Sequence, residues 1–271
     1  MGEPAIPQPL AISLVQGETR WHDMAANRRY YGDLVRSIGS RSDLVVLPET
    51  FLSGFTNETL GNAETMDGEG LRWLRDLGAE VGAVITGSLI VREGERCVNR
   101  LVWMRPDGSH AHYDKRHLFR MAGEHERYAD GRERLIVELG GWRICPQVCY
   151  DLRFPVWLRN RRDPDTGRFD YDLVLFVANW PAARRHAWRT LLRARAIENL
   201  GYCVGVNRVG VDGNGIAYAG DSAVLDFLGQ PMVEAGAQEQ VVTVTLDPQP
   251  LAAHRERFPA WMDADTFRIE T

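Results

Sequence analysis

Short, nearly continuous apolar runs alternate with amphipathic stretches along most of this sequence. The run "DLVVLPE" (43–49) is almost entirely valine and leucine until Pro48 interrupts it. A strand that is apolar on both faces lies inside a sheet covered by other layers. By contrast, 25–38 and 69–82 place apolar residues three and four apart, which is the spacing of one face of a helix. The pattern therefore predicts an α/β fold with a covered sheet.

The same patterns predict the remaining elements. Strands are expected over 10–16, 83–93, 96–115, 142–149, 172–180, 202–210 and 218–229, and a helix over 187–201 with Gly201 closing it. Pro106-Asp107-Gly108 and the glycine-rich "VDGNG" (211–215) are turn signals between strands. No low-complexity linker divides the 271 residues, so we expect one domain over 1–271. The pattern fits either one mixed sheet or two sheets packed between helices.

Composition excludes several classes of function. Hydrophobic residues make up 44% and charged residues 25%, as in an ordinary soluble globular protein. A net charge of -5 with scattered basic residues argues against a nucleic-acid surface. No apolar run approaches the roughly 18 residues of a membrane helix, and the N-terminus lacks the pattern of a signal peptide. Four cysteines in a chain of this length do not form a disulfide framework, so a reduced, cytoplasmic protein is expected.

Neither a metal nor a cofactor is expected. The histidines of "HAH" (110–112) have no acidic or cysteine partner at ligand spacing, so they are predicted to be solvated hairpin residues. The segment "GVDGNG" (210–215) lacks the strand-to-helix context of a dinucleotide loop. Cys145 and Cys149 are too far apart along a strand to form a disulfide, and their spacing is not that of a redox motif.

Three predicted strands end in reactive side chains: Glu49, Lys115 and Cys149. Taken singly, each has an ordinary interpretation. Glu49 would be a loop residue or helix cap, Lys115 a solvated surface charge, and Cys149 an inert core thiol. Together they supply a base, an electrophile and a nucleophile. A free thiol has a pKa of about 8.5. A carboxylate can take its proton, and an ammonium can stabilise the oxyanion of acyl transfer. Sequence spacing cannot show that these three residues converge.

The words "LPETFLSGF" (47–55), "YDKRHLF" (113–119) and "CYDLRFP" (149–155) resemble the three signature segments of the nitrilase, or carbon-nitrogen hydrolase, superfamily. The resemblance continues through "ANWP", "LLRARAIENLGY", "NRVG" and "GDSAVLDFLG", and covers about residues 10–260. These segments are most similar to those of the bacterial omega-amidase branch. That branch hydrolyses the terminal amide of 2-oxo-dicarboxylic acid monoamides such as 2-oxoglutaramate.

The resemblance implies an α-β-β-α sandwich of two mixed sheets flanked by helices. It also implies that Glu49 is the general base, Lys115 the oxyanion stabiliser and Cys149 the nucleophile of a thioester mechanism. The backbone N–H of Tyr150 would be a second oxyanion donor.

Members of the superfamily carry a second glutamate that orients the lysine, typically seven residues before a glycine. Counting back from Gly131 gives Glu124, with Glu126 as the alternative.

A 2-oxo-carboxylate tail needs its own binding group, and a planar arginine suits a carboxylate. Arg153, four residues past Cys149, is the candidate; a salt bridge between Arg153 and Asp151 is the alternative. The side chains expected to line the pocket, unless they are simply core residues, are those of Phe119, Asn179 and Trp180.

The expected partners are a small-molecule amide and a second copy of the chain. The resemblance implies that the C-terminal tail, about 250–271, and the helix after the nucleophile help to pair subunits in a homodimer or higher homo-oligomer. The alternative is a tail that docks on its own subunit.

Two rival functions stay open at this point. A nitrile, an N-carbamoyl compound or a simple aliphatic amide would be cleaved by the same chemistry. Alternatively, the chain is a non-catalytic α/β binding or redox protein in which Cys149 is structural. Iodoacetamide separates this last case, because a nucleophile would react ahead of Cys97, Cys145 and Cys203.

Overall fold

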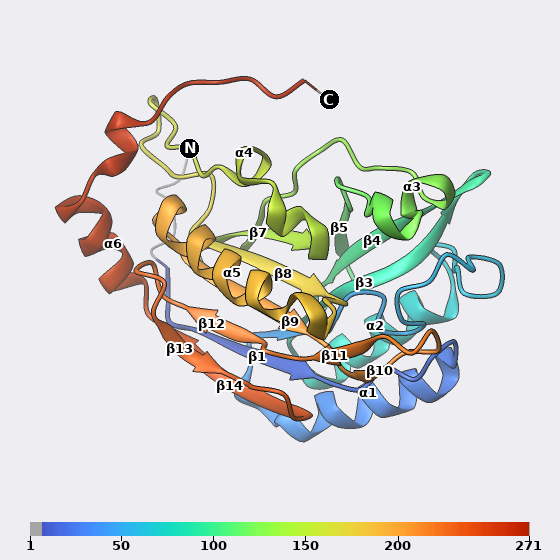
Figure 1. Cartoon of the computed structure of the whole chain (residues 1–271). Helices are drawn as coiled ribbons and strands as arrows, with labels where there is room; N and C mark the ends of the chain where they lie inside the picture. Colours follow the sequence, from blue (N-terminus) through green and yellow to red (C-terminus); the bar gives the residue numbers. More distant parts are fainter. Residues whose placement is uncertain (1–6, 271) are drawn as a thin grey trace.

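Two six-stranded sheets form the centre of the computed structural model, which describes residues 7–270 (Figure 1). The first sheet has the order β14-β1-β2-β3-β4-β5. Its strands are β1 (Leu10–Gln16), β2 (Leu44–Val46), β3 (Val84–Glu93), β4 (Arg96–Met104), β5 (His110–Asp114) and β14 (Gln240–Leu246). The second sheet has the order β13-β12-β9-β8-β7-β6. Its strands are β6 (Val137–Leu139), β7 (Trp142–Val148), β8 (Leu173–Ala178), β9 (Tyr202–Asn207), β12 (Ala223–Leu225) and β13 (Pro231–Glu234).

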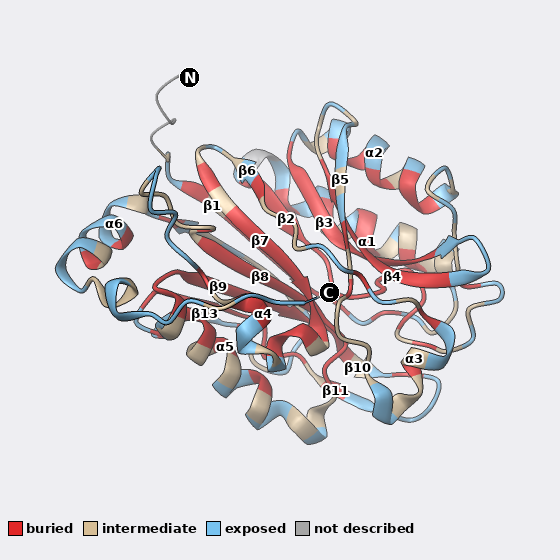
Figure 2. Ribbon diagram, turned by 90° about the horizontal axis from the view of Figure 1, so that it is seen from above, coloured by how far each residue is buried: buried red, intermediate tan, exposed pale blue. Residues whose placement is uncertain are grey.

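Strand β2 shows why the apolar run at 43–49 is almost continuous. Leu44 and Val46 belong to the core between the two sheets, whereas Val45 belongs to the core under the helices. Successive side chains of a strand point to opposite faces, so a strand covered on both sides needs apolar residues at every position. Figure 2 shows the central strands buried along most of their length.

Helices cover the outer face of each sheet. Helices α1 (Met24–Ile38) and α2 (Glu69–Val81) pack against the first sheet, and α5 (Arg185–Asn199) packs against the second (Figure 1). The layers therefore follow the order α-β-β-α with mixed sheets, which confirms the predicted fold class and excludes the single-sheet alternative.

Strand direction brings the predicted catalytic segments to one edge of the molecule. Strands β1, β2 and β3 are parallel, while β4 is antiparallel to both β3 and β5. Strand β5 therefore runs in the same direction as β2, and the segments carrying Glu49 and Lys115 leave the first sheet at the same edge. In the second sheet β7, β8 and β9 are parallel, so Cys149 and Asn179 follow neighbouring strand ends.

The hairpin predicted around "GVDGNG" is present, but its flanking runs are not single strands. Strand β10 (Val209–Val211) pairs with β11 (Ala217–Ala219) in a separate two-stranded sheet. The prediction of one strand over 218–229 was wrong because Gly220 and Asp221 both have a left-handed backbone, with φ of 61° and 56°. Two consecutive residues in that conformation end a strand.

The end of α5 also differs from the prediction. Leu200, not Gly201, adopts the left-handed conformation that closes this helix, with φ of 48°. The Leu200 carbonyl oxygen accepts a hydrogen bond of 2.8 Å from Arg255 Nε, which holds this turn in place. Gly201 instead allows a close approach, because a Cβ there would lie 3.0 Å from the Asp172 carbonyl oxygen.

The C-terminal segment contacts its own chain through α6 (Pro248–Arg257) and the short turn η5 (Ala260–Asp263). Arg255 forms an ion pair with Asp172, and Trp261 packs against Phe169 and the Arg162 guanidinium. A role of 250–271 in a homodimer stays a prediction, as does the single domain over 1–271. Within residues 7–270, no helix is long and apolar enough to cross a membrane.

The close packing of α5 on β9 can be tested at Gly205. A Cβ at this position would lie 2.7 Å from both Leu192 Cδ1 and Trp188 Cζ2. We expect Gly205→Ala to lower the free energy of unfolding by about 1–3 kcal/mol, because the helix must move or its side chains must leave their rotamers. Urea unfolding followed by circular dichroism would measure the change.

Gly78→Ala, in the buried face of α2, is the matched control. Its nearest contact would be 3.6 Å, and helical alanine is favoured over glycine, so stability should rise by about 0.5–1 kcal/mol. Equal stability of Gly205→Ala and wild type would contradict the predicted close contact.

Candidate active site

Glu49 is buried at the edge where the two sheets meet, in the loop after β2. Its Oε1 accepts hydrogen bonds from Asn99 Nδ2 (2.8 Å) and Lys115 Nζ (3.0 Å). Its Oε2 accepts the backbone N–H of Asn179 at 2.7 Å. Three donors, one in β4 and two directly after β5 and β8, therefore hold one carboxylate in a single orientation. A rigid carboxylate of this kind is suited to transfer protons at a defined position.

Lys115 follows β5, and both of its backbone groups are anchored. Its N–H donates to the Asn99 carbonyl oxygen (2.9 Å), and its carbonyl oxygen accepts from the Gly131 N–H (3.0 Å). A Cβ at Gly131 would lie 2.0 Å from the Asp114 carbonyl oxygen, so only glycine allows this approach. The ammonium is buried and lies 3.0 Å from Glu49 Oε1 and 3.0 Å from both oxygens of Glu124.

Glu124, rather than Glu126, is the second carboxylate on Lys115. It begins the short helix α3 (Glu124–Arg127) and is fully buried, whereas Glu126 is exposed. Its Oε2 also accepts the Phe119 N–H at 2.6 Å. Burial raises the pKa of Glu124 above its usual value, while Lys115 opposes that rise. The first turn of α3 thus brings Glu124, and not Glu126, to Lys115, and its role as the second glutamate stays a prediction.

The neighbouring carboxylates explain why Lys115 keeps its proton. Burial alone would lower the pKa of Lys115, but Glu124 and Glu49 together raise it well above its usual value. The lysine is therefore a cation in the resting protein. With both carboxylates ionised, one positive and two negative charges leave the cluster at -1.

Cys149 follows β7 in the turn η3 (Cys149–Arg153) and has a left-handed backbone with φ of 45°. Burial, followed by the charge of Glu49, raises the pKa of its thiol well above the usual value, although Lys115 acts in the opposite direction. A non-glycine residue pays a conformational cost in this region, and such strain is common where a side chain must be presented to a pocket. The resting sulfur is a thiol next to a base.

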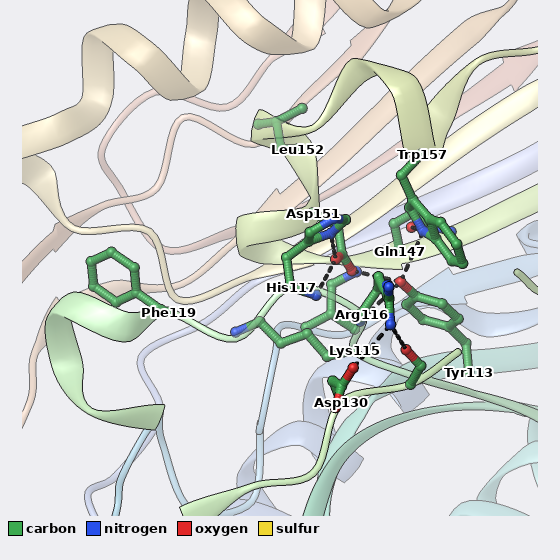
Figure 3. Close-up of polar contacts among 12 residues, drawn as sticks. Tyr113, Lys115, Arg116, His117, Phe119, Asp130, Gln147, Asp151, Leu152 and Trp157 are labelled. Atoms are coloured by element: carbon green, nitrogen blue, oxygen red, sulfur yellow. Dashed lines mark hydrogen bonds and ion pairs between the residues drawn. The ribbon is translucent and has the colours of Figure 1, made fainter. Parts of the chain in front are cut away.

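Asp151, in the turn η3, lies beside Tyr113 and His117, as the close-up in Figure 3 shows. Its buried carboxylate accepts the Val148 N–H at 3.1 Å and the Tyr113 hydroxyl at 2.9 Å. It also accepts the backbone N–H of His117 (2.9 Å) and lies 2.8 Å from His117 Nδ1. One side chain thus ties the turn after β7 to the segment that carries Lys115.

The pocket in front of Cys149 has an empty volume of about 520 Å³ and a mostly apolar wall. Its lining residues include Glu49, Lys115 and Cys149, and also Phe119, Tyr150, Arg153, Asn179 and Trp180. All the residues predicted to line the pocket therefore lie around one cavity. Asn179 also donates its side-chain N–H groups to the Glu49 carbonyl oxygen (2.7 Å) and to Thr50 Oγ1 (2.9 Å). It therefore holds Glu49 in position and also forms part of the pocket wall.

Arg153 does not form the alternative salt bridge with Asp151. Its guanidinium lies 5.0 Å from the centre of the Trp180 ring, and across residues 7–270 it has no carboxylate within ion-pair distance. Since Asp151 is buried and already has four donors around it, the arginine is left available to the pocket.

Sequence reasoning missed several residues of this site. Asn99 lies in the middle of β4 and carries no motif that points to a role beside Glu49. Phe55, Arg184 and Tyr218 also line the pocket. Arg184 had a partial signal, because it lies four residues after Trp180 in a run of basic residues beyond a strand end. Within the described chain, no group of three or more His, Cys, Asp or Glu side chains could hold a metal ion.

Comparisons with known proteins agree with this geometry. The sequence model of the carbon-nitrogen hydrolase family matches residues 11–256. Omega-amidase YafV of Yersinia enterocolitica is 49% identical over 261 residues, covering 96% of this chain and 98% of that protein. 2-Oxoglutaramate amidase of Bacillus subtilis (strain 168) is 30% identical over 256 residues, covering 93% of this chain and 96% of that protein.

A solved structure resembles the whole chain. XC1258 from Xanthomonas campestris, a CN-hydrolase superfamily protein with an arsenic adduct in the active site, is 61% identical and has a TM-score of 0.95. The match covers 97% of this chain and 100% of that chain. The superfamily predicted from three short signature segments is thereby confirmed: the chain belongs to the carbon-nitrogen hydrolase family.

Proposed function

We propose that this protein is an omega-amidase, which hydrolyses the terminal carboxamide of a small 2-oxo-dicarboxylic acid monoamide such as 2-oxoglutaramate. The observation that carries the proposal is the meeting of one thiol, one buried ammonium and two buried carboxylates at a pocket with unpaired arginines. The names of the relatives, omega-amidase and 2-oxoglutaramate amidase, support the same substrate class.

The first half of the reaction forms a thioester. Glu49 takes the Cys149 thiol proton as the sulfur attacks the amide carbon, and the carbonyl oxygen becomes an oxyanion. Lys115 and the Tyr150 N–H stabilise this charge. When the intermediate collapses, the C–N bond breaks, Glu49 returns the proton to the leaving nitrogen, and ammonia departs.

The second half regenerates the thiol. Glu49 takes a proton from water, the resulting hydroxide attacks the thioester carbon, and a second oxyanion forms in the same position. Collapse breaks the C–S bond, releases the carboxylic acid, and lets the sulfur recover its proton from Glu49. The same carboxylate serves as base and acid in turn, which requires the fixed position that Asn99 and the Asn179 N–H support.

The substrate assignment rests on Arg153 in the pocket wall. A 2-oxo-carboxylate is an anion, and Arg153 offers it a guanidinium without a competing carboxylate in the described chain. Nitriles, N-carbamoyl compounds and simple aliphatic amides would undergo the same chemistry. Nitriles and simple aliphatic amides carry no anion for this charge, whereas an N-carbamoyl amino acid does, and against that class the names of the relatives favour an omega-amide.

A substrate panel tests the proposed function. Ammonia release should be fastest with 2-oxoglutaramate and much slower with an N-carbamoyl amino acid or an aryl nitrile. Cys149→Ala should abolish release, since no other group can form the thioester. A wild-type protein that prefers the nitrile or the carbamoyl compound would contradict the omega-amidase assignment.

The role of the second glutamate can be tested with a matched pair of variants. Glu124→Gln should lower kcat/KM by about 100- to 1000-fold, because Lys115 loses the carboxylate that fixes it beside the oxyanion. Glu126→Gln, two residues along the same short helix but exposed, should stay within about twofold of wild type. Equal losses in the two variants would argue against a specific role for Glu124.

Thiol labelling with iodoacetamide tests the electrostatics of the nucleophile. The wild-type rate at Cys149 should keep rising as the pH passes about 8.5, because burial and then Glu49 raise the pKa of this thiol and the thiolate is the reactive form. Glu49→Gln removes the negative charge, so the rise should move to lower pH even though turnover is lost. Mass spectrometry of labelled peptides measures the rate.

Cys145 and Cys203 are internal controls for the same experiment. Both are fully buried, and burial raises the pKa of Cys145 to about 12, so neither should be labelled in the folded protein. Equal labelling of all the cysteines would favour the non-catalytic interpretation of Cys149. A wild-type rate that levels off below pH 8.5 would instead contradict the raised pKa of this thiol.

A further inference from the structure

Arg184 is a second guanidinium at the pocket, and no carboxylate in residues 7–270 pairs with it. Its neighbour Arg185 provides the contrast, because it forms a bidentate ion pair with Asp221 at 2.8 and 2.9 Å. An arginine that lines a catalytic pocket without a partner in the protein has all its donors available for a ligand.

The backbone of Arg184 is fixed by the pocket wall. It ends the short turn η4 (Ala182–Arg184), and its carbonyl oxygen accepts the indole N–H of Trp180 at 2.9 Å. The ring of the same tryptophan lies beneath the Arg153 guanidinium. One buried indole therefore positions both arginines, one through its ring and the other through its N–H.

The Arg184 side chain extends across the pocket. Its guanidinium lies 5.1 Å from the centre of the Phe119 ring, which belongs to the segment after β5, while Arg184 itself follows β8. The Phe119 N–H is held by Glu124, so this ring is tied to the catalytic cluster. Arg184 thus connects the segment after β8 with the segment after β5 at the pocket wall.

The distribution of charge in the pocket is uneven. With both carboxylates ionised, the lysine and two carboxylates beside Cys149 sum to -1, and Glu49 accepts hydrogen bonds from Asn99, Lys115 and Asn179. The two arginines, unpaired among residues 7–270, add +2 to the mostly apolar wall of the same pocket. A molecule with a neutral amide at one end and an anion at the other matches this arrangement.

We infer that Arg184 and Arg153 together form a carboxylate clamp, and that Arg184 is a specificity-determining residue that selects omega-amides with an anionic 2-oxo-acid end. The inference rests on the proposed omega-amidase function. Two guanidinium groups can donate hydrogen bonds to both carboxylate oxygens and to the neighbouring 2-oxo oxygen. With Arg153 alone, at least one of these three oxygens would have no arginine donor.

The test compares an anionic amide with a neutral one. Arg184→Met keeps an apolar stem against Phe119 and removes only the charge. Loss of a charge-assisted hydrogen bond should raise KM for 2-oxoglutaramate by about 10- to 100-fold while kcat stays within about threefold. The ratio of kcat/KM for 2-oxoglutaramate over that for pentanamide should fall by about the same 10- to 100-fold factor. Arg184→Lys should recover part of the ratio, since it restores the charge without the planar fork.

Arg189→Met is the matched control, because Arg189 is an exposed residue of α5 whose ion pair with Glu234 is long, at 3.7 Å. It should leave the ratio unchanged. A parallel loss on both substrates in Arg184→Met would assign Arg184 to structure rather than specificity, and an unchanged ratio would overturn the clamp.

A turnover-independent measurement separates this inference from the proposed function. In wild type, 2-oxoglutarate should slow the labelling of Cys149 by iodoacetamide, and Arg184→Met should need about 10- to 100-fold more of it for the same protection. If wild type fails to hydrolyse 2-oxoglutaramate but shows this difference, the proposed substrate is wrong and the clamp stands. Equal protection of the two proteins would overturn the clamp whatever the substrate.

Discussion

The buried ammonium of Lys115 is the interaction on which the rest of the site depends. A single buried lysine would be strongly disfavoured, and two carboxylates at 3.0 Å offset this cost. Because Glu49 follows β2 and Glu124 begins α3, satisfying one charge draws two separate segments to the end of β5. The cation therefore organises the pocket as well as taking part in its chemistry, and the Gly131 approach to Asp114 completes its backbone anchorage.

The same cluster sets the resting state of the nucleophile. Burial and then the charge of Glu49 raise the pKa of the Cys149 thiol, so the sulfur keeps its proton until a substrate arrives. Proton transfer to Glu49 is then coupled to attack, because the developing negative charge moves away from the sulfur toward the oxyanion donors. The resting protein therefore holds a thiol, and the thiolate forms only when a substrate is bound.

The pocket is divided between chemistry and recognition. Its carboxylates accept hydrogen bonds from Lys115 and its neighbours, whereas its two arginines have aromatic rings beneath them and no anionic partner among residues 7–270. Packing on an aromatic face holds a guanidinium in place without consuming its hydrogen-bond donors. Trp180 lies at the junction of the two regions, next to Asn179 on the chain, and so links the position of the base to that of the arginines.

The sequence by itself determined the covered strands, the helices and the reactive set, while the choice of two sheets over one came from the family resemblance. Apolar periodicity predicted the covered strands and the helices α1, α2 and α5, because burial on one or both faces leaves a local pattern. Glu49, Lys115 and Cys149 stood out at strand ends, and the signature segments assigned the superfamily. Only the tertiary structure decided the choice of Glu124 over Glu126, the support of Glu49 by Asn99, and the unpaired state of Arg153 and Arg184. These depend on which side chains from distant segments meet, and contacts across the fold leave no periodic trace in one chain.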